Sequence, residues 1–525
     1  MTFKICLPTA GTGSRLNKIT KHINKSLVDI ENKPIISYLI ENFPKDSRYV
    51  IPLGYKGNLV RQYLELVYPY HNFEFVSIYP YEGKDSGLGL TLLNCKSFLQ
   101  EPFIFIPCDA LISSKIPDPS INWMGYSELK DKRQYRTVNI RDNKVVKINE
   151  KSSNTSLKDF IYTGLCGIQN FDLFWEVMER NKEFSCEIGE VFGMQYLIKD
   201  GVKAVKLQWN DIGNEKSLTK TRQIYKKENS PTILEKEKEK IWFVDNKVIK
   251  FNLDKKFISN RVKRAAKLSD FIPEILASSP NMFIYKKVEG DIFSQVVNLN
   301  LFKKFLNISE LFWKKIELNN QEKEEFIFAC KNFYKNKTLA RINQFFDENN
   351  INDSSLIING VETPPLSSLL SKINWENLSQ GKPVIFHGDF HFENIIYTTK
   401  KDKFYFLDWR QDFNGIIDYG DIYYDLAKLY HGLLINHSII EEGLYNVHWD
   451  KNICDFDFHR KNILVYCEEF FKEWIELKGY SFNKVEILTS LIFLNISPLH
   501  HYPYSKLLFL LGKYMLHKNI FRNEY

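Results

Sequence analysis

Short apolar runs separated by polar loops recur along this chain, and they predict a mixture of buried strands and helices. Residues 3–8, 103–107 and 383–386 are apolar runs of strand length, and each leads into a loop that carries glycine or a carboxylate. Residues 241–251 contain two apolar runs around an Asp-Asn pair, which is the pattern of a β-hairpin. The polar groups with chemical potential therefore follow the ends of predicted strands.

Two further stretches bear on the organisation of the chain. Residues 488–499 and 507–516 are the most apolar runs, but both are too short and interrupted to span a bilayer, so we predict helices of a folded domain. Residues 216–240 are polar with alternating Lys and Glu, which indicates a domain boundary or the solvated face of a connecting helix. Because the chain opens directly on a strand, we expect no signal peptide.

Composition narrows the class of protein. A length of 525 residues suggests two to four domains. The formal net charge of +7 is modest and no basic stretch is interleaved with aromatic residues, so we expect no nucleic-acid partner. The 8 cysteines include no Cys-x-x-Cys pair, which argues against a zinc site or a disulfide framework. These features fit a cytoplasmic protein and leave a homo-oligomer open.

A dense group of polar residues follows the apolar run 383–386. Asp389 lies in the loop after it, Asn394 follows, and Asp408 ends a second apolar run. Phosphoryl transfer from ATP needs a carboxylate that orients and deprotonates the attacking hydroxyl, with an Asn and an Asp that hold Mg²⁺ on the phosphates. The order His-Gly-Asp-(four residues)-Asn, then Asp-Trp, resembles the aminoglycoside phosphotransferase and choline kinase branch of the protein-kinase-like fold.

This resemblance implies a role for each matching residue. Asp389 would be the catalytic base, and Asn394 and Asp408 would be the metal ligands. His387 would support the loop, and Asp425 would be structural and not catalytic. The implied fold is an α+β bilobal domain, with a small β-rich lobe upstream of a larger helical lobe.

The predicted hairpin places Lys250 where this family has its phosphate-binding lysine, although a solvated strand lysine is an alternative. The helix expected to follow, residues 258–268, contains Arg261, Lys263 and Arg264 but no Glu that could pair with Lys250. Residues 285–290, which include Glu289, resemble the hinge between the lobes and part of the nucleotide site. The partner of Lys250 is therefore not identified from the sequence.

A glycine-containing loop follows the first apolar run of the chain. Ala10, Gly11 and Gly13 lie where the strand turns into a helix, and glycines there let backbone amides approach phosphate oxygens. Dinucleotide-binding folds use a similar loop, but they place an acidic residue about twenty positions later. This chain has the basic run 21–25 instead, which argues against that interpretation.

Three further features resemble the nucleotidyltransferase family. Residues 24–36 match its signature, in which Pro-Lys-x-Leu precedes Gly-Lys-Pro, except that Asn24 and Asn32 replace Pro and Gly. Asp109 ends the apolar run 103–107, and Asp211 lies in the Asp-Ile-Gly context that the family uses. The resemblance implies a three-layer α/β/α domain, Rossmann-like with a mixed and mostly parallel sheet.

In the reaction that this resemblance implies, a phosphomonoester attacks the α-phosphate of an NTP and expels pyrophosphate. Arg15 and Lys25 would neutralise charge on the triphosphate and at the transition state. Two strand-end carboxylates, those of Asp109 and Asp211, would hold Mg²⁺. Lys151 would contact the second substrate, and Gly87 also falls where the family has a related nucleotide-binding residue.

Because the product of one predicted reaction is the substrate of the other, we predict a bifunctional enzyme that activates a small hydroxylated molecule. Such donors commonly feed capsule polysaccharide or lipid assembly. Residues 22–30 are similar to bacterial phosphocholine cytidylyltransferases, which favours CTP. Trp409 and Arg410 fall in the substrate region, and choline kinases carry an acidic residue where this chain has Arg410. A cation there would repel choline, so Arg410 favours an anionic or polyhydroxylated substrate.

Two alternatives share these residues. One is a sugar kinase joined to a nucleotide-sugar pyrophosphorylase that uses UTP, GTP or dTTP, and the other is a nucleotide-binding regulatory protein with one inactive domain. The predicted organisation is a nucleotidyltransferase domain at 1–225, a linker at 226–240 and a kinase-like domain at 241–525. Its small lobe would end near residue 290, and its large lobe would occupy 291–525.

Overall fold

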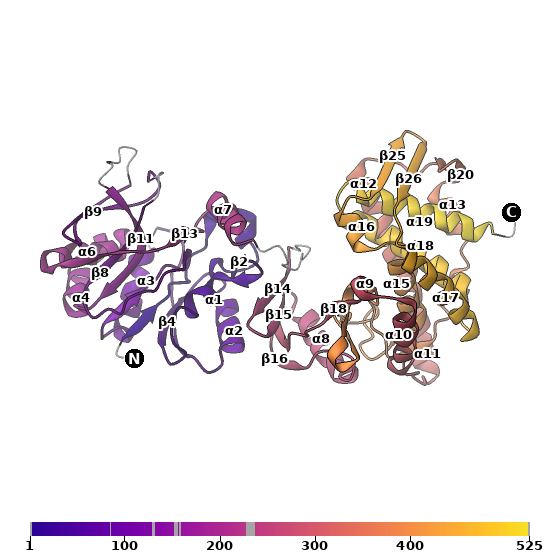
Figure 1. Cartoon of the computed structure of the whole chain (residues 1–525), viewed down its shortest axis with the longest axis horizontal. Coiled ribbons are helices and arrows are strands. Elements are labelled where there is room, and N and C mark those ends of the chain that lie inside the picture. Colours follow the sequence, from indigo (N-terminus) through magenta and orange to yellow (C-terminus); the bar gives the residue numbers. More distant parts are fainter. Residues whose placement is uncertain are drawn as a thin grey trace. The chain divides into compact units, whose positions relative to one another are not determined.

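The computed structural model describes residues 3–522 except 85, 129–131, 152–155, 157–158 and 227–236, so most of the predicted linker lies outside the described residues. The chain divides into two compact units (Figure 1). The first comprises Met1–Lys255 and Leu276–Tyr285, and the second comprises Lys256–Ile275 and Lys286–Tyr525. Among the described residues, no helix combines the length and the apolar character that crossing a membrane requires.

A mixed sheet forms the centre of the first unit. Among the described residues it has 9 strands in the order β5-β4-β1-β6-β11-β8-β12-β10-β9. β1 pairs in parallel with β4 and β6, whereas β11 runs antiparallel to β6. The strands are β1 Lys4–Cys6, β4 Arg48–Leu53, β5 Asn72–Ser77, β6 Phe103–Phe105, β8 Trp123–Ser127, β9 Thr137–Arg141, β10 Lys144–Asn149, β11 Asp159–Ile168 and β12 Val202–Lys206.

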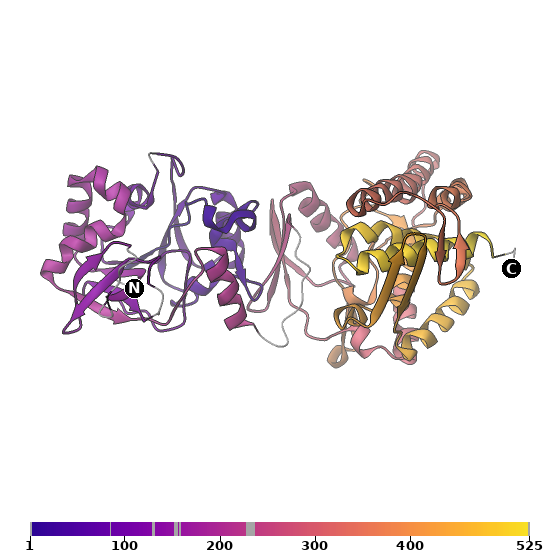
Figure 2. The same cartoon turned by 90° about the horizontal axis from the view of Figure 1, so that it is seen from above.

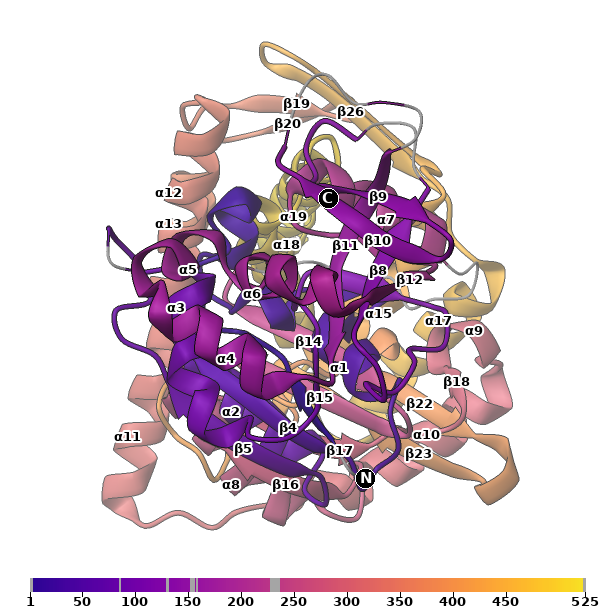
Figure 3. The same cartoon turned by 90° about the vertical axis from the view of Figure 1, so that its left-hand side faces the viewer.

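Alternate side chains along and just after β1 enter two different hydrophobic cores, as expected for a strand in a sheet that is covered by helices on both faces. Ile5 and Leu7 belong to one core, and Cys6 belongs to the other. Helices α1 and α2 contribute to the first core, and α3, α4 and α6 contribute to the second (Figure 3). The helices are η1 Ser14–Thr20, η2 Lys25–Leu27, α1 Ile35–Ile40, α2 Gly57–Val67, α3 Leu88–Cys95, η3 Lys96–Phe98, α4 Phe171–Arg180, α5 Lys182–Ile188, α6 Glu190–Leu197, η4 Ile198–Asp200 and α7 Glu215–Tyr225.

Two short ribbons lie beside the main sheet. β2 (Asp29–Ile30) pairs with β3 (Lys33–Pro34), and β7 (Ala110–Ile112) pairs antiparallel with β13 (Trp209–Asp211). The second ribbon joins segments about a hundred residues apart, and each of its strands adjoins one of the predicted metal carboxylates.

The predicted hairpin at 241–251 is confirmed, because β14 (Glu239–Val244) pairs antiparallel with β15 (Lys247–Asn252). With β17 (Met282–Lys286) and β16 (Ile275–Ser279) they form a sheet in the order β14-β15-β17-β16 (Figure 2). The structure therefore has the sheet that the small lobe requires.

The buried face of this sheet belongs to the core of the first unit. Trp242 is fully buried, and its ring packs edge-on against Tyr63 of α2 with centroids 5.4 Å apart. The Gln62 side chain accepts hydrogen bonds from the Ser279 hydroxyl and the Asn281 N–H, both at 3.0 Å. This sheet and one face of the main sheet therefore share a hydrophobic core.

Helices dominate the second unit. The predicted helices at 488–499 and 507–516 are confirmed in α18 (Phe482–Ile496) and α19 (Tyr504–Ile520), which pack together. The other helices are α8 Lys255–Leu268, α9 Phe293–Val296, α10 Leu299–Phe312, α11 Asn320–Lys331, the π-helix η5 Asn332–Asn336, α12 Lys337–Asn349, α13 Leu366–Ser371, α14 Trp375–Ser379, η6 Phe392–Asn394, η7 Thr399–Lys401, α15 Ile422–Leu434, α16 His437–Glu441, α17 Asn462–Leu477 and η8 Ser497–Leu499.

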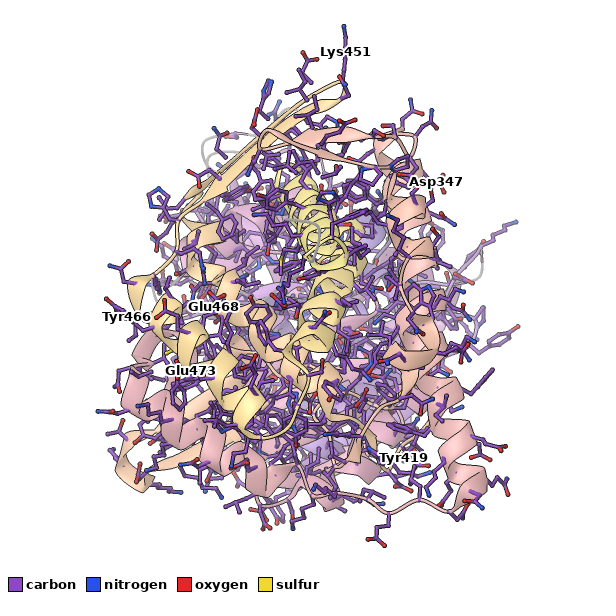
Figure 4. The ribbon with its side chains drawn as sticks, turned by 90° about the vertical axis from the view of Figure 1, so that its right-hand side faces the viewer. Asp347, Tyr419, Lys451, Tyr466, Glu468 and Glu473 are labelled. Atoms are coloured by element: carbon purple, nitrogen blue, oxygen red, sulfur yellow. The ribbon has the colours of Figure 1, made fainter. Side chains whose placement is uncertain are left out.

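Small sheets complete the second unit. The order β18-β22-β23 forms one of them, β20-β19-β26-β25 another, and β21 pairs with β24. Lys451 lies at the turn between β25 and β26, on the face that Figure 4 shows. The strands are β18 Asp291–Ile292, β19 Leu356–Ile358, β20 Val361–Thr363, β21 Pro383–Val384, β22 Ile395–Thr398, β23 Lys403–Phe406, β24 Gly420–Asp421, β25 Tyr445–Asp450 and β26 Ile453–Phe458.

Candidate active sites

The structure brings the two predicted carboxylates of the first unit together. Asp211 lies opposite Ala110 in the β7–β13 ribbon, and the Ile212 N–H donates to the Asp109 carbonyl at 3.1 Å. A Cβ atom placed on Gly213 would lie 3.0 Å from both Asp109 Oδ2 and Asp211 Oδ1. Both carboxylates therefore border the same small space, which a side chain at position 213 would fill.

The predicted cations border the same space. The Lys25 ammonium forms an ion pair with Asp109, and Arg15 Nη2 lies 3.7 Å from Asp109 Oδ2. The same Cβ position on Gly213 would lie 3.3 Å from Arg15 Nη2. Burial raises the pKa of Asp109, but the charges of Lys25 and Arg15 outweigh it and hold the pKa below its ordinary value. Asp109 is therefore ionised at neutral pH and able to take a cation.

The glycine-containing loop places Lys25. Gly13 has a φ of +68°, and a Cβ on it would lie 3.1 Å from Lys25 Cβ and from Thr20 Cγ2. Asn24, which replaces the family's proline, donates from Nδ2 to the Thr9 carbonyl at 2.9 Å. The glycine turn and Asn24 thus fix the segment that carries Lys25 against the loop after β1.

The other predicted residues of the first unit differ in how closely neighbouring atoms approach them. The Ala10 carbonyl accepts the Tyr55 N–H at 2.9 Å, whereas a Cβ on Gly11 would meet no atom within 4 Å. A Cβ on Gly87 would lie 2.8 Å from the Cys186 carbonyl oxygen, so the backbone passes closely there. Lys151 is exposed, and residues 152–155 after it lie outside the described residues.

Tyr135 is a site residue that sequence reasoning missed. Its hydroxyl donates to Asp211 Oδ2 at 3.0 Å, while the Gly213 N–H donates to Asp211 Oδ1 at 3.0 Å. These donors orient the carboxylate toward the space it shares with Asp109. No local pattern marks Tyr135, because it lies 76 residues before Asp211 in the chain.

Glu190 is a buried carboxyl group that the sequence did not single out. It is 5% exposed, and no described residue hydrogen-bonds to its Oε2 atom. Burial raises the pKa of Glu190 from 4.5 to about 7, although Arg136 opposes the rise.

Replacing Glu190 with glutamine is expected to reduce the pH dependence of stability. Folding retains a proton that the unfolded chain releases above pH 4.5, so wild-type stability falls as the pH rises from 4.5 to about 7. The loss is about 3 kcal/mol, since a tenfold change in proton affinity equals about 1.4 kcal/mol. Urea denaturation of the wild type and of Glu190→Gln at pH 5 and pH 8 measures this change in the free energy of unfolding. An equal difference between wild type and Glu190→Gln at the two pH values would contradict this account.

In the second unit, Asp425 holds the predicted catalytic loop. Its fully buried carboxylate accepts the N–H groups of His387 at 2.7 Å and Gly388 at 2.6 Å. The Trp313 indole N–H also donates to it, at 3.0 Å. Gly388 has a φ of +88°, a conformation that suits glycine. This geometry gives Asp425 the structural role that the resemblance implies.

Asp389 and Asn394 lie together beyond that loop. The Asn394 amide donates to Asp389 Oδ2 at 3.1 Å, and Lys428 Nζ lies 2.8 Å from Asp389 Oδ1. Burial raises the pKa of Asp389, but Lys428 and His391 outweigh it and hold the pKa well below its ordinary value. His387 supports the loop, because its Nδ1 accepts the Asp389 N–H at 3.2 Å. Lys428, on α15, is a further site residue that the sequence did not indicate.

Asp408 adjoins Asn394 through the β22–β23 pair. The Leu407 N–H donates to the Asn394 carbonyl at 2.7 Å, which places Asp408 next to it. Arg261 Nη1 donates to Asp408 Oδ1 at 3.2 Å. Arg264 donates to the carbonyls of Phe386 and Arg410. The helix that lacks the expected Glu therefore contacts the catalytic segments through two arginines.

The remaining predicted kinase residues occupy different environments. Lys250 is buried on β15 of the first unit, opposite Ile241, so the solvated-strand alternative is wrong. The Glu289 carbonyl accepts the Thr398 hydroxyl at 3.0 Å. Trp409 is 2% exposed and its indole N–H donates to the Arg261 carbonyl at 3.0 Å. We therefore correct the expected substrate contact of Trp409, because its ring packs beneath α8.

Both sets of predicted metal ligands suit a hard divalent cation, because they supply oxygen atoms. Mg²⁺ is commonly bound through one or two protein oxygens together with substrate phosphates, and it retains water ligands. The described residues contain no group of three or more His, Cys, Asp or Glu that could hold a metal alone. The space shared by Asp109 and Asp211 fits a site that is completed by a nucleotide, and in the second unit Asn394 lies against the backbone that leads into Asp408.

Comparison with known proteins matches two segments of the chain to family models. Residues 7–228 match the family model described as nucleotidyl transferase, and residues 365–445 match the one described as phosphotransferase enzyme family. The bifunctional protein GlmU of Methanococcus vannielii is 24% identical over 240 residues, which are 43% of this chain and 55% of GlmU. The chain spans about half the length of the curated relatives it matches.

Solved structures also resemble the first part of the chain. The CTP:phosphocholine cytidylyltransferase of Streptococcus pneumoniae is 19% identical, with 43% of this chain and 100% of that chain covered and a TM-score of 0.35. The UDP-glucose pyrophosphorylase of Acinetobacter baumannii is 18% identical, with 43% and 93% covered and a TM-score of 0.36.

The two family matches and the sheet order confirm the predicted fold classes. The mixed sheet between two helical layers is the predicted α/β/α fold, and the second match falls on the segment that contains Asp389, Asn394 and Asp408. This chain therefore combines a region similar to nucleotidyl transferases with a region similar to the phosphotransferase enzyme family.

Proposed function

We propose that this chain is a bifunctional enzyme that phosphorylates a small hydroxylated molecule with ATP and then couples the phosphoester to CTP. The observation that carries the proposal is that each unit brings together polar residues of one predicted site. Asp109 and Asp211 border one space in the first unit, and Asp389 contacts Asn394 and Lys428 in the second.

In the second unit, the acceptor hydroxyl attacks the γ-phosphorus of ATP. Asp389 is ionised, because Lys428 and His391 hold its pKa low, so it accepts the hydroxyl proton. Lys428 fixes the carboxylate, and Asp425 fixes the loop that carries it. A Mg²⁺ ion held by Asn394 and Asp408 would neutralise charge on the ATP phosphates.

In the first unit, the phosphoester attacks the α-phosphorus of the nucleotide and pyrophosphate leaves. Arg15 and Lys25 are placed to neutralise the triphosphate. A Mg²⁺ ion held by Asp109 and Asp211 would neutralise charge on the reacting phosphates. Tyr135 and the Gly213 N–H orient Asp211 for that task.

The choice of CTP rests on residues 22–30, which are similar to phosphocholine cytidylyltransferases. The product would be a nucleoside-diphosphate-activated donor for surface polysaccharide or lipid decoration. A sugar kinase joined to a pyrophosphorylase for UTP, GTP or dTTP would use the same residues and differ in the base and the acceptor.

Incubation of the full chain with Mg²⁺, ATP, an alcohol library and one second nucleotide at a time tests this function. We expect ADP formation with one acceptor class, and pyrophosphate and a new CDP-linked mass with CTP. Activation with UTP, GTP or dTTP in place of CTP would support the alternative enzyme. Absence of ADP and of pyrophosphate with every acceptor and phosphoester would refute the proposal.

A further inference from the structure

Two cationic side chains share one aromatic ring beside the proposed kinase site. Lys337 Nζ lies 4.4 Å from the centre of the Phe333 ring, and Arg410 Cζ lies 4.8 Å from it. Phe333 belongs to the π-helix η5, and Lys337 begins α12 directly after it. π-Helical turns within longer helices are frequent at functional sites.

This pair lies next to the catalytic loop. A Cβ on Gly388 would lie 2.6 Å from Arg410 Cβ and 3.1 Å from Arg410 Cδ, so the Arg410 stem packs on the residue before Asp389. The Arg410 N–H donates to the His387 carbonyl at 2.8 Å. Lys428 adds a third positive charge, 2.8 Å from Asp389. The attacking hydroxyl would therefore reach Asp389 beside a wall formed by the basic side chains of Lys337, Arg410 and Lys428.

Two side chains of this wall have no acidic partner among the described residues. Within the described ranges, neither Lys337 nor Arg410 forms an ion pair with a carboxylate, and Arg410 Nε is buried without a hydrogen-bond partner. Burial lowers the pKa of Lys337 to about 6, and the charges of Arg410, Lys428 and Arg341 add to this effect, so at neutral pH Lys337 is protonated mainly when an anion lies close to it. Burying basic side chains close together is unfavourable in free energy unless an anion approaches them.

We infer that Lys337 and Arg410 bind an anionic group of the acceptor, so that the kinase substrate is an alcohol that also carries a carboxylate or a phosphate. This inference rests on the proposed kinase function. The acceptor oxygen forms its bond to the γ-phosphorus, the bond from that phosphorus to the β–γ bridging oxygen breaks, ADP leaves, and Asp389 takes the hydroxyl proton. The anionic group stays on the wall and is unchanged.

Small alcohols that differ in charge test the inference in the full chain. Glycerate and glycerol 3-phosphate supply the two anionic groups, glycerol is the neutral counterpart, and choline and ethanolamine are cations. We expect kcat/KM for one anionic acceptor to exceed that for glycerol by at least about 10-fold. A preference for choline, ethanolamine or glycerol would overturn the inference while leaving the kinase function intact.

Variants of the wall distinguish binding of the acceptor from binding of ATP. Lys337→Met and Arg410→Met are expected to raise KM for the anionic acceptor about 10- to 100-fold and to leave KM for ATP near its wild-type value. Lys335→Met is the matched control, because the Lys335 ammonium lies 5.7 Å from the centre of the Trp375 ring instead of the Phe333 ring. If KM for ATP rose instead, Lys337 and Arg410 would bind the nucleotide and not the acceptor, and the inference would be overturned.

Calorimetry with glycerate and with glycerol 3-phosphate gives a readout that does not depend on turnover. Lys337→Met should weaken binding of the preferred anion at least about 10-fold. Unchanged affinity, or no binding of either anion to the wild-type chain, would overturn the inference. Binding that is lost in Lys337→Met, in a chain that forms no ADP, would support the anion site and refute the kinase function.

Discussion

Replacing Asp389 with asparagine is expected to lower ATP-dependent phosphorylation of the acceptor about 100- to 10,000-fold, the range that general-base catalysis contributes. Asparagine keeps the size of the side chain but removes the charge that Lys428 and His391 stabilise. The variant should therefore bind its substrates and fail to take the hydroxyl proton. Pyrophosphate release in the other unit should be unchanged, because it depends on different residues.

The measurement is a coupled assay of ADP formation, with pyrophosphate release followed separately in the same preparation. Asp347→Asn is the matched control, because Asp347 is an exposed carboxylate on α12 that Figure 4 labels. This control should phosphorylate the acceptor at the wild-type rate. If Asp389→Asn kept more than about a tenth of the wild-type rate, the role of Asp389 as the base would be refuted.

The parts of the sites that the sequence predicted are those in which a short motif contains both the strand and the reactive group. Asp389 and Asn394 are five residues apart, so the loop that carries one also carries the other. Asp109 follows its own apolar strand in the same way. Local pattern therefore identified these residues, and the structure brought Asp109 and Asp211 together as expected.

Residues that enter a site from distant helices and loops gave no such signal. Lys428 lies on α15, which follows the strands β22, β23 and β24 that come after Asp389, and in the sequence it is one lysine on an apolar helix. For Trp409 the sequence indicated a role that the structure does not support. An aromatic residue next to a predicted metal ligand is interpreted as a substrate contact. Only the packing of α8 shows that its ring is buried.

The organisation of the chain was also only partly visible in its composition. The polar stretch at 216–240 suggested that a separate kinase-like domain starts near residue 241. In the structure, Trp242 and the rest of that sheet complete a hydrophobic core with Tyr63 of α2. Alternating apolar residues show that a strand has a buried face, but they do not show which partner covers it.

Replacing Asp109 or Asp211 with asparagine is expected to lower pyrophosphate release at least about 100-fold, comparable to the loss of a main electrostatic contact at a transition state. Asp109→Asn also leaves Lys25 without its ion-pair partner, so it should be the more damaging of the two. Phosphorylation of the acceptor should continue at the wild-type rate and the phosphoester should accumulate. Asp200→Asn, an exposed carboxylate of the same unit, is the control.

The double variant decides whether the two carboxylates act as one site. If both hold the same cation, removing the second should cost little once the first is gone, because residues that act as a unit are strongly non-additive. Asp109→Asn/Asp211→Asn should then lose about as much activity as the worse single variant. A double variant that loses the product of the two single effects would show that Asp109 and Asp211 act independently, and a shared metal would be refuted.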